Sequence, residues 1–590
     1  MTAASTIAGE RSGFFAPIAI WLIACAFMCL ATAHAIANGS FPDPDDVMRL
    51  LEVRDWIGGQ SWFDVTQYRL NGPAGVPMHW SRLVDVPIAA VMLLARPFVG
   101  GDRAETIAIV VVPLVTLGIA MFLVHRIALK LMTSRAALAA VAATPFSLGA
   151  MKQMRPMRID HHGWQIVLSL VGLIACFDQR PRRSGLVAGT AMALWLNISL
   201  EGLPFAVAVG TIFAFEWLRK GTVQRLETFV AALAVSSILI FAGTHLPSSW
   251  TTQKHDVVTL AYLAGFATAS LSISALARID IDRWQLRLAA LGAAGILAIC
   301  AMFVTDPHWM TGPFSSLDPI VRKFWYNTVD EGLPMWQVDW SEAAMGLAQP
   351  LVGLIGASAA LATTSGRLRE RWAIYLFLLL GVTVSSIAVL RIATTASVIA
   401  MPGTALLCQL ALRRARAQSF AAARVVSTTA AIFVMTPAYA LPVSVVPSSP
   451  RLQNAVAAAG DCEKASQVSK LRQLGTAEIA APLDITPAIL LNTHDRAVAT
   501  GHHRNVTGMR DTIRLFLNAP ASGEPIIKAR NIDFVVLCPG APESIRYAHR
   551  GPDGLAAMLL ANRAPKWLEP IGVPGLTSLK VWRVQKELLA

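Results

Sequence analysis

Long apolar segments without a charged side chain recur along most of this chain. Residues 107–124 and residues 428–443 are two of them. Segments of about 20 apolar residues match the hydrocarbon thickness of a lipid bilayer. Of the 590 residues, 54% are apolar and 15% are charged, whereas about a quarter of the residues in a soluble protein are charged. The sequence therefore predicts a polytopic α-helical membrane protein.

Thirteen membrane-spanning helices are expected from the positions of the apolar segments. The first, residues 14–36, is expected to remain uncleaved because it is longer than the apolar core of a signal peptide. A shorter apolar piece, residues 86–99, is expected to lie along the membrane interface. The other expected spans are residues 105–129, 136–151, 163–177, 185–200, 203–218, 227–247, 257–276, 287–304, 343–364, 373–390, 393–411 and 422–444.

The net charge of +13 comes mainly from basic loops, which indicates an oriented membrane protein and not one that binds nucleic acid. Cytoplasmic loops of membrane proteins carry an excess of Lys and Arg. With a cytoplasmic N-terminus and spans that alternate in direction, these basic loops all fall on the cytoplasmic side. The membrane is expected to be the inner (cell) membrane. These loops contain Lys130 and Arg135; Arg180, Arg182 and Arg183; Arg219, Lys220 and Arg225; Arg278, Arg283 and Arg287; Arg367, Arg369 and Arg371; and Arg413, Arg414 and Arg416.

The tail of residues 447–590 is more polar than the rest and is expected to lie outside the cytoplasm, in the periplasm of a Gram-negative cell. Its helix-like stretch at 463–474 and strand-like run at 533–537 predict a small α/β domain. Cys462 and Cys538 lie in this tail, where a disulfide or two free thiols are both open. The run His502-His503-Arg504-Asn505 is expected to build the fold.

Acidic residues gather in three loops that alternation places on the outer side, residues 38–104, 152–162 and 305–342. These loops contain Asp45 and Asp46, Asp160 and His162, and Glu331. Clusters of oxygen ligands favour hard divalent cations such as Mg²⁺ or Mn²⁺, and Mn²⁺ also accepts an imidazole.

Each of these residues also has a structural interpretation. Asp45 or Asp46 could cap the helix that is expected to follow. Asp160 could pair with Arg155 or Arg158 at the membrane edge. His161 is interpreted as an ordinary interfacial residue, and Glu331 could be a solvated loop residue.

Together the loops resemble the catalytic subunit of oligosaccharyltransferases, in the C-type (GT-C) glycosyltransferase superfamily. Asp45-Asp46, followed by Arg54-Asp55, is similar to the family's first outer loop with its metal-binding aspartate. Asp160-His161-His162 resembles the family's Asp-x-His motif, and Thr328-Val329-Asp330-Glu331 resembles its Ser/Thr-x-x-Glu motif. Arg391 lies where the family has an arginine that holds the donor's phosphate.

The resemblance implies a GT-C transmembrane domain over residues 1–446 and an outer domain over residues 447–590. It implies a metal-assisted, inverting glycosyltransferase that moves a sugar or oligosaccharide from a polyprenyl-(pyro)phosphate donor to an acceptor on the outer face. The implied metal ligands are Asp45, Asp160, His162 and Glu331, with Asp45 or Asp46 accepting the acceptor's proton. No Trp-Trp-Asp motif follows residue 447, so the acceptor stays open among a lipid, a polysaccharide and a protein.

A second hypothesis is a transporter or flippase for a lipid-linked or envelope substrate. Transporters usually place ionisable residues near the middle of the membrane, whereas the acidic residues here lie in outer loops. A scaffold that keeps the fold without activity is a third hypothesis.

Overall fold

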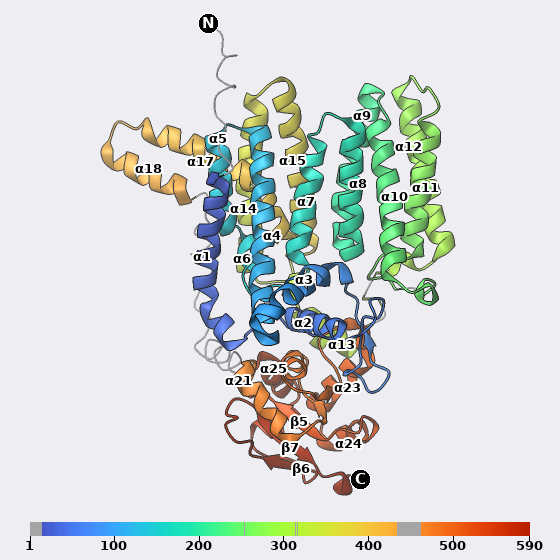
Figure 1. Cartoon of the computed structure of the whole chain (residues 1–590), viewed down its shortest axis with the longest axis vertical. Coiled ribbons are helices and arrows are strands. Elements are labelled where there is room, and N and C mark those ends of the chain that lie inside the picture. Colours follow the sequence, from blue (N-terminus) through green and yellow to red (C-terminus); the bar gives the residue numbers. More distant parts are fainter. Residues whose placement is uncertain (1–14, 253, 313, 316, 434–461, 590) are drawn as a thin grey trace.

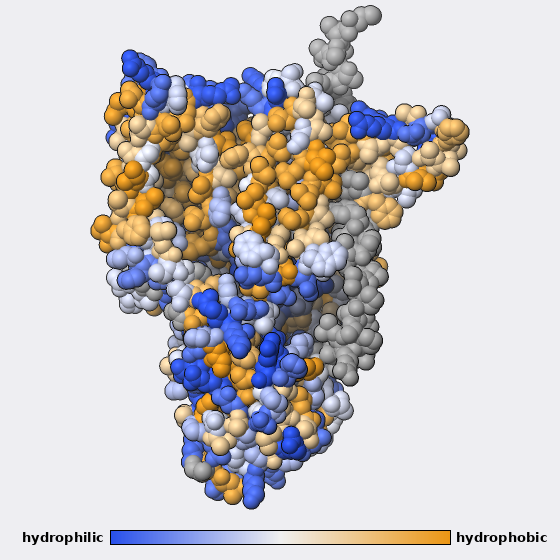
Figure 2. Space-filling view, turned by 180° about the vertical axis from the view of Figure 1, so that it is seen from behind, coloured by the Kyte–Doolittle hydropathy of each residue, from blue (hydrophilic) through white to orange (hydrophobic). Residues whose placement is uncertain are grey.

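The computed structural model describes residues 15–252, 254–312, 314–315, 317–433 and 462–589. A bundle of long helices forms one end of the molecule, and a region of short helices and strands from the C-terminal part of the chain lies against the other end (Figure 1). On the face that Figure 2 shows, hydrophobic residues form a broad band across the bundle, and hydrophilic residues cover its far end and much of the C-terminal region.

Within the described residues, seven helices are long and apolar enough to cross a membrane, or eight if one bent pair is a single span. The chain is therefore a multi-pass membrane protein. The helices that coincide with expected spans are α1 (Phe15–Asn38), α4 (Gly101–Leu131), α7 (His162–Cys176), α8 (Pro181–Ile198), α9 (Leu203–Lys220), α10 (Gln224–Thr244), α11 (Leu260–Leu276), α12 (Trp284–Thr305), α14 (Trp340–Thr363), α15 (Gly366–Ala388), the pair α16 (Ile392–Ile399) and α17 (Met401–Arg416), and α18 (Ala421–Phe433).

The expected count of thirteen spans is not confirmed, for two physical reasons. The segment expected at 136–151 is broken into α5 (Ser134–Ala143), a 3₁₀ turn at Thr144–Phe146 and α6 (Leu148–Gln153). Pro145 lies in that turn, and the Ser147 side chain accepts a hydrogen bond from the Ala150 amide to start α6. The expected span 422–444 is described only as far as Phe433, and its second half lies outside the described residues.

Glycines set the closest helix contacts in the bundle. A Cβ on Gly185 would lie 2.5 Å from the Arg225 carbonyl oxygen, and one on Gly189 would lie 2.4 Å from the Phe229 carbonyl oxygen. The four-residue spacing puts both glycines on the face of α8 that packs against α10. Small residues at this spacing allow helix backbones to approach closely in membranes.

The pair α16 and α17 bends by 47°. Pro402 follows the bend and has no amide hydrogen to donate. The Tyr375 hydroxyl from α15 donates to the Ile399 carbonyl at 2.7 Å and accepts from the Gly403 amide at 3.1 Å. The tyrosine thus satisfies backbone groups that the bend leaves open inside the bundle.

Two helices cover the end of the bundle nearest the C-terminal region. These are α2 (Pro44–Ile57) and α3 (Arg82–Val99), and α3 runs across the bundle end (Figure 1). One side of α3 is buried, whereas Leu94 and Phe98 are exposed. This placement fits the interfacial position expected for residues 86–99.

The C-terminal region contains a five-stranded sheet in the order β4-β3-β5-β7-β6. The central strand β5 (Phe534–Leu537) pairs in parallel with β3 (Glu478–Ala480) and antiparallel with β7 (Lys580–Val584). All four residues of β5 are buried because its alternate side chains enter two separate cores. The outer strands are β4 (Arg496–Ala497) and β6 (Leu568–Ile571).

Helices pack around this sheet, so the predicted strand and the α/β character are confirmed. They are α21 (Ala465–Val468), α22 (Thr486–Asn492), α23 (Val506–Leu517), α24 (Pro520–Ala529), α25 (Pro542–Arg550) and α26 (Leu555–Leu560). Cys462 and Cys538 form a disulfide that joins the chain before α21 to the end of β5. The expected domain boundary at 446/447 lies outside the described residues and stays a prediction.

The C-terminal region is firmly attached to the loops at the bundle end. Leu490 and Leu491 of α22 share a buried core with residues of α2, and α13 (Pro319–Phe324) packs against α23. Arg69 adds hydrogen bonds, because its guanidinium donates to the Leu490 carbonyl at 2.8 Å and its carbonyl accepts from the Ala497 amide at 2.8 Å. These contacts hold the C-terminal region against the end of the bundle.

Candidate catalytic site at the end of the bundle

The first acidic motif lies at the start of α2. Asp43 is the N-cap, and its side chain accepts a hydrogen bond from the Asp45 amide at 3.0 Å. Pro44 occupies the first helical position, where its missing amide hydrogen costs nothing. Because Asp43 caps the helix, the capping interpretation of Asp45 and Asp46 is wrong, and both carboxylates are free for other contacts.

Asp46 is fully buried and uses both oxygens to hold the loop before α7. One oxygen accepts from the amides of Ile159 and Asp160 at 2.8 and 2.9 Å, and the other accepts from the Arg158 guanidinium at 2.9 Å. A carboxylate bonded in this way is not available to take a proton from a substrate. These contacts favour a positioning role for Asp46, and its predicted catalytic role stays a prediction.

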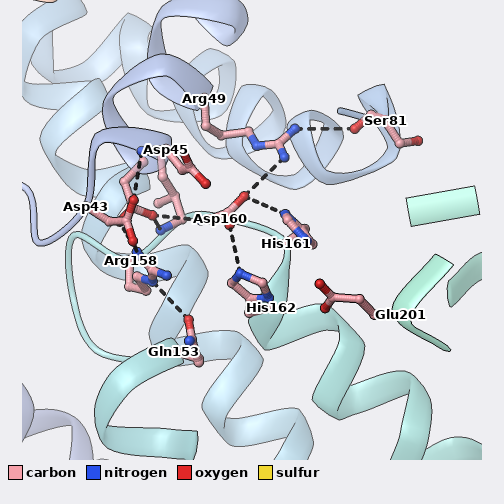
Figure 3. A network of polar contacts seen from close by, with 12 residues as sticks. Asp43, Asp45, Arg49, Ser81, Gln153, Arg158, Asp160, His161, His162 and Glu201 are labelled. Carbon is pink, nitrogen blue, oxygen red and sulfur yellow. Dashed lines mark hydrogen bonds and ion pairs between the residues drawn. The ribbon is translucent and has the colours of Figure 1, made fainter. Parts of the chain in front are cut away.

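Asp160 lies at the centre of the site (Figure 3). Its Oδ1 accepts from Arg49 at 3.2 Å and contacts His161 Nδ1 at 2.7 Å, whereas its Oδ2 lies 3.4 Å from His162 Nε2. The alternative interpretation, in which Asp160 pairs with Arg155 or Arg158, is wrong, because Asp160 pairs with Arg49 and Arg158 pairs with Asp43 and Asp46.

Asp160 Oδ2 is buried and has no hydrogen-bond partner among the described residues. Burial raises the pKa of Asp160, but contact with His161 acts in the opposite direction and holds this pKa well below its usual range. An ionised carboxylate with one bare, buried oxygen is costly unless a donor or a cation reaches it. This oxygen is the strongest indication of a ligand in the site.

Glu331 and Arg391 come from two loops that meet here. The Arg391 amide donates to the Glu331 carbonyl at 2.9 Å, and the two side chains form an ion pair at 3.6 Å. Arg391 also pairs closely with Glu201, in the turn between α8 and α9. Sequence reasoning missed Glu201, although alternation of the expected spans already places that turn on the same side as the other acidic loops.

Asp45 faces the C-terminal region. Its Oδ1 lies 3.2 Å from His502 Nε2, and the His502 Nδ1 lies 2.7 Å from the Thr500 hydroxyl. His502 is 2% exposed and meets the Trp80 ring edge-on. The expectation that His502 only builds the fold is therefore incomplete, because its ring contacts a predicted metal ligand. No local pattern could reveal this contact, which joins residues 457 positions apart.

Negative charge accumulates around these groups. Burial raises the pKa of Glu331 to about 7, with Asp43 and Asp45 adding to the shift against the opposing Arg391. The pKa of the partly exposed Asp45 is likewise raised. The first cause is burial against neighbouring protein atoms, and the second is the negative charge of Asp43 and Asp160. Carboxylates that raise each other's pKa are stabilised in their charged form by a nearby cation.

The similarity of this chain to known proteins lies in its fold and not in its sequence. No protein-family model matches the sequence, and no curated protein matches it significantly. A structure of archaeal oligosaccharyltransferase AglB from Archaeoglobus fulgidus, in complex with an inhibitory peptide and a dolichol-phosphate, matches 94% of this chain and 72% of that chain with a TM-score of 0.63 and 14% identity. This chain has the fold of an archaeal oligosaccharyltransferase. The resemblance to GT-C glycosyltransferases is thus confirmed at the level of the fold.

Two further oligosaccharyltransferase structures from the same organism share this fold. One is tethered to an acceptor peptide that contains the NVT sequon, and it matches 98% of this chain and 75% of that chain, with a TM-score of 0.62 and 13% identity. The other is a complex with Zn and sulfate, and it matches 93% of this chain and 71% of that chain, with a TM-score of 0.57 and 14% identity.

Within the oligosaccharyltransferase fold, this chain has one group that could hold a metal among the described residues. It consists of Asp160, His161 and His162, whose donor atoms lie within 4.8 Å of one another. Two predicted ligands, Asp160 and His162, are thus brought together, and His161 joins them against expectation. No described group that includes Asp45 or Glu331 meets the same distance limit, so the role of these two residues stays a prediction.

Proposed function

We propose that this protein is a membrane glycosyltransferase that moves a sugar or oligosaccharide from a polyprenyl-(pyro)phosphate donor to an acceptor. The observation that carries the proposal is the buried Asp160 Oδ2, which has no hydrogen-bond partner among the described residues and lies beside His162 in an oligosaccharyltransferase fold. One neighbour of the same fold binds a dolichol-phosphate, which supports a lipid-phosphate donor. Another carries an acceptor peptide, which supports a peptide acceptor.

The residues present fit a divalent cation such as Mg²⁺ or Mn²⁺. Asp160 Oδ2 and His162 Nε2 would hold it, with Asp45 and Glu331 as the further predicted ligands. A cation there would act as a Lewis acid and neutralise charge that develops on the departing phosphate. His161 and Arg49 bind the other Asp160 oxygen and keep the carboxylate oriented.

Arg391 is the proposed phosphate-binding residue. Its guanidinium is fixed by Glu201 and Glu331, and a planar guanidinium can present paired donors to a phosphate. Asp45 is the proposed proton acceptor, because it is the site carboxylate that keeps exposed surface next to a histidine. Direct displacement by the acceptor would invert the anomeric centre.

The proposed orientation puts this site on the outer face of the inner membrane and the N-terminus in the cytoplasm. Two observations support it. The basic loops lie at the end of the bundle away from the site, and the C-terminal region carries a disulfide, which is typical of oxidising compartments.

The proposal predicts that Asp160→Asn lowers transfer from a polyprenyl-phosphate-linked sugar by at least about 100-fold, the size of effect typical of losing one charge-stabilising group. Transfer by the purified protein, with and without EDTA, measures this. Asp102→Asn, an exposed carboxylate at the start of α4, is the matched control and should retain activity. Near-normal transfer by Asp160→Asn would contradict the assignment of Asp160 to the catalytic site. Lipid movement across vesicles without sugar transfer would favour the flippase hypothesis.

A further inference from the structure

A groove in the membrane-facing surface lies at the end of the bundle away from the candidate catalytic site. It has a volume of about 690 Å³ and is formed by the end of α7, the last turns of α9 and the first turns of α15. The 18-residue α9 starts next to Glu201 and ends at the groove, a length of about 27 Å. The groove and the catalytic site therefore lie at opposite membrane surfaces.

The walls of the groove are apolar where they face the bilayer. Phe215 of α9 and Phe377 of α15 line it and are 58% and 44% exposed, with Ile212 and Ile374 beside them. Exposed aromatic and aliphatic side chains at this depth contact hydrocarbon. The groove therefore offers a surface along which acyl chains can lie.

Its polar end carries more cations than carboxylates. The cations are Arg219, Lys220, Arg225, Arg367 and Arg371, and the carboxylates are Asp178, Glu216 and Glu370. Two of the cations are paired within the groove, Arg225 with Glu216 at 3.3 Å and Lys220 with Glu370 at 4.0 Å. The side chains of Arg219 and Arg367 make no hydrogen bond or ion pair with any described residue, so their guanidinium groups are available to a ligand.

We propose that this groove binds an anionic phospholipid of the surrounding bilayer. The headgroup phosphate lies between Arg219 and Arg367, and the acyl chains follow Phe215 and Phe377. Basic pockets between transmembrane helices on the cytoplasmic side are suited to anionic headgroups. The groove favours a whole lipid over a free anion, because a lipid contacts both the cations and the apolar wall of Phe215 and Phe377, whereas a soluble phosphate contacts only the cations.

Native mass spectrometry of the full-length protein tests this inference with phosphatidylglycerol and phosphatidylcholine of identical acyl chains. Wild type should retain one phosphatidylglycerol under conditions that remove phosphatidylcholine. Arg219→Gln/Arg367→Gln should weaken retention at least about tenfold, since each cation near the headgroup contributes independently. The control Arg413→Gln/Arg416→Gln removes the same charge at the same end of the bundle, from exposed residues outside the groove, and should retain the lipid.

A second measurement does not depend on lipid counting. Phosphatidylglycerol should raise the melting temperature of wild type and of the Arg413/Arg416 control but not that of the Arg219/Arg367 variant, because a ligand that binds the folded state stabilises it. Equal stabilisation of all three proteins would overturn the inference. Protection by inorganic phosphate alone, or preference for a polyprenyl phosphate at equal mole fraction, would also overturn it. Glycosyl transfer is not read in either experiment, so failure here is distinct from failure of the proposed function.

Discussion

Arg49 lies fully buried among three carboxylates, those of Glu52, Asp85 and Asp160. Its guanidinium contacts Asp85 at 3.0 Å and Asp160 at 3.2 Å, and Glu52 at 3.9 Å. A buried arginine is costly unless its donors are matched, so this residue fixes the geometry around it. It holds one oxygen of Asp160 and thereby turns the other toward His162.

His502 is the residue whose role can be tested most directly. Its Nε2 contacts Asp45, and we expect His502→Ala to lower glycosyl transfer by roughly 10- to 100-fold because Asp45 loses the group that orients it. His502→Gln should restore part of this loss, since its amide nitrogen can occupy the position of Nε2. Metal content of the purified variants separates a positioning role from loss of the site.

The matched control for that test is His503→Gln. His503 is the next residue, but it pairs with Asp256 at 2.8 Å. If His503→Gln impairs transfer as strongly as His502→Ala, or if His502→Gln restores nothing, the contact with Asp45 is not what matters.

Glu543 predicts a pH dependence of stability in the C-terminal region. Burial and the nearby Asp484 raise the pKa of Glu543 to about 7, from 4.5. The folded state therefore holds this proton more tightly than the unfolded state, and its stabilisation is present below about pH 4.5 and is lost as the pH rises to 7. Hydrogen exchange of the Leu483 and Asp484 amides, which donate to Glu543, should quicken over this range beyond its intrinsic pH dependence. Protection that increases with pH would contradict this sign.

Sequence reasoning predicted that Asp160 and His162 lie together, as they do, but it did not predict which residues hold them in place. Asp160, His162 and Arg391 lie next to apolar runs whose alternation puts them on one face, and the structure brings them together. Glu201 and His502 were missed because a lone acid in a turn, or a histidine in a distant region, carries no local signal. Only tertiary packing decides that they reach Arg391 and Asp45.

Among the helices, α8 and α10 approach each other closely where Gly185 and Gly189 face backbone carbonyls. Adding a methyl group there forces the two helices apart. Overpacking of this kind costs about 1–3 kcal/mol. This helix pair also affects the position of Glu201, because α8 leads directly into the turn that carries it.

We expect Gly189→Ala to lower the melting temperature of the detergent-solubilised protein. Its new Cβ would lie 2.4 Å from the Phe229 carbonyl oxygen. Gly292→Ala in α12 is the matched control, because nothing lies within 4 Å of a Cβ at that position. Alanine favours helix over glycine by about 1 kcal/mol, so the control should be neutral or stabilising. A Gly189→Ala protein as stable as the control would refute this packing argument.

Apolar periodicity predicted where most helices lie, because helices are the simplest way to satisfy backbone groups in a bilayer. It failed at residues 136–151, where total hydrophobicity suggests a span but Pro145 and Ser147 divide the segment. It also could not show that Tyr375 supports the bend between α16 and α17. Hydropathy averages over a window, whereas breaks depend on single residues.

At the scale of the whole molecule, the two ends of the bundle differ in chemistry. One end has the acidic loops and the C-terminal region, and the other has the basic loops and the groove of α7, α9 and α15. This polarity predicts a fixed orientation, which labelling of single engineered cysteines can measure.

A membrane-impermeant maleimide should label Glu569→Cys from the periplasm once the outer membrane is permeabilised. It should label Arg182→Cys only after the inner membrane is opened. Both positions are exposed, one in β6 and one at the start of α8, and the unsubstituted protein measures labelling of the native cysteines. Labelling of Arg182→Cys with the inner membrane intact would reverse the proposed orientation.

The contact between Asp45 and His502 also has a consequence for the timing of biosynthesis. Asp45 and Asp160 are synthesised early, whereas His502 emerges only after every described helix of the bundle has been made. A ribosome-bound chain with all these helices inserted still lacks the histidine that holds Asp45. If the proposed orientation holds, the contact between Asp45 and His502 forms last, after the C-terminal region has crossed the membrane and folded against the bundle.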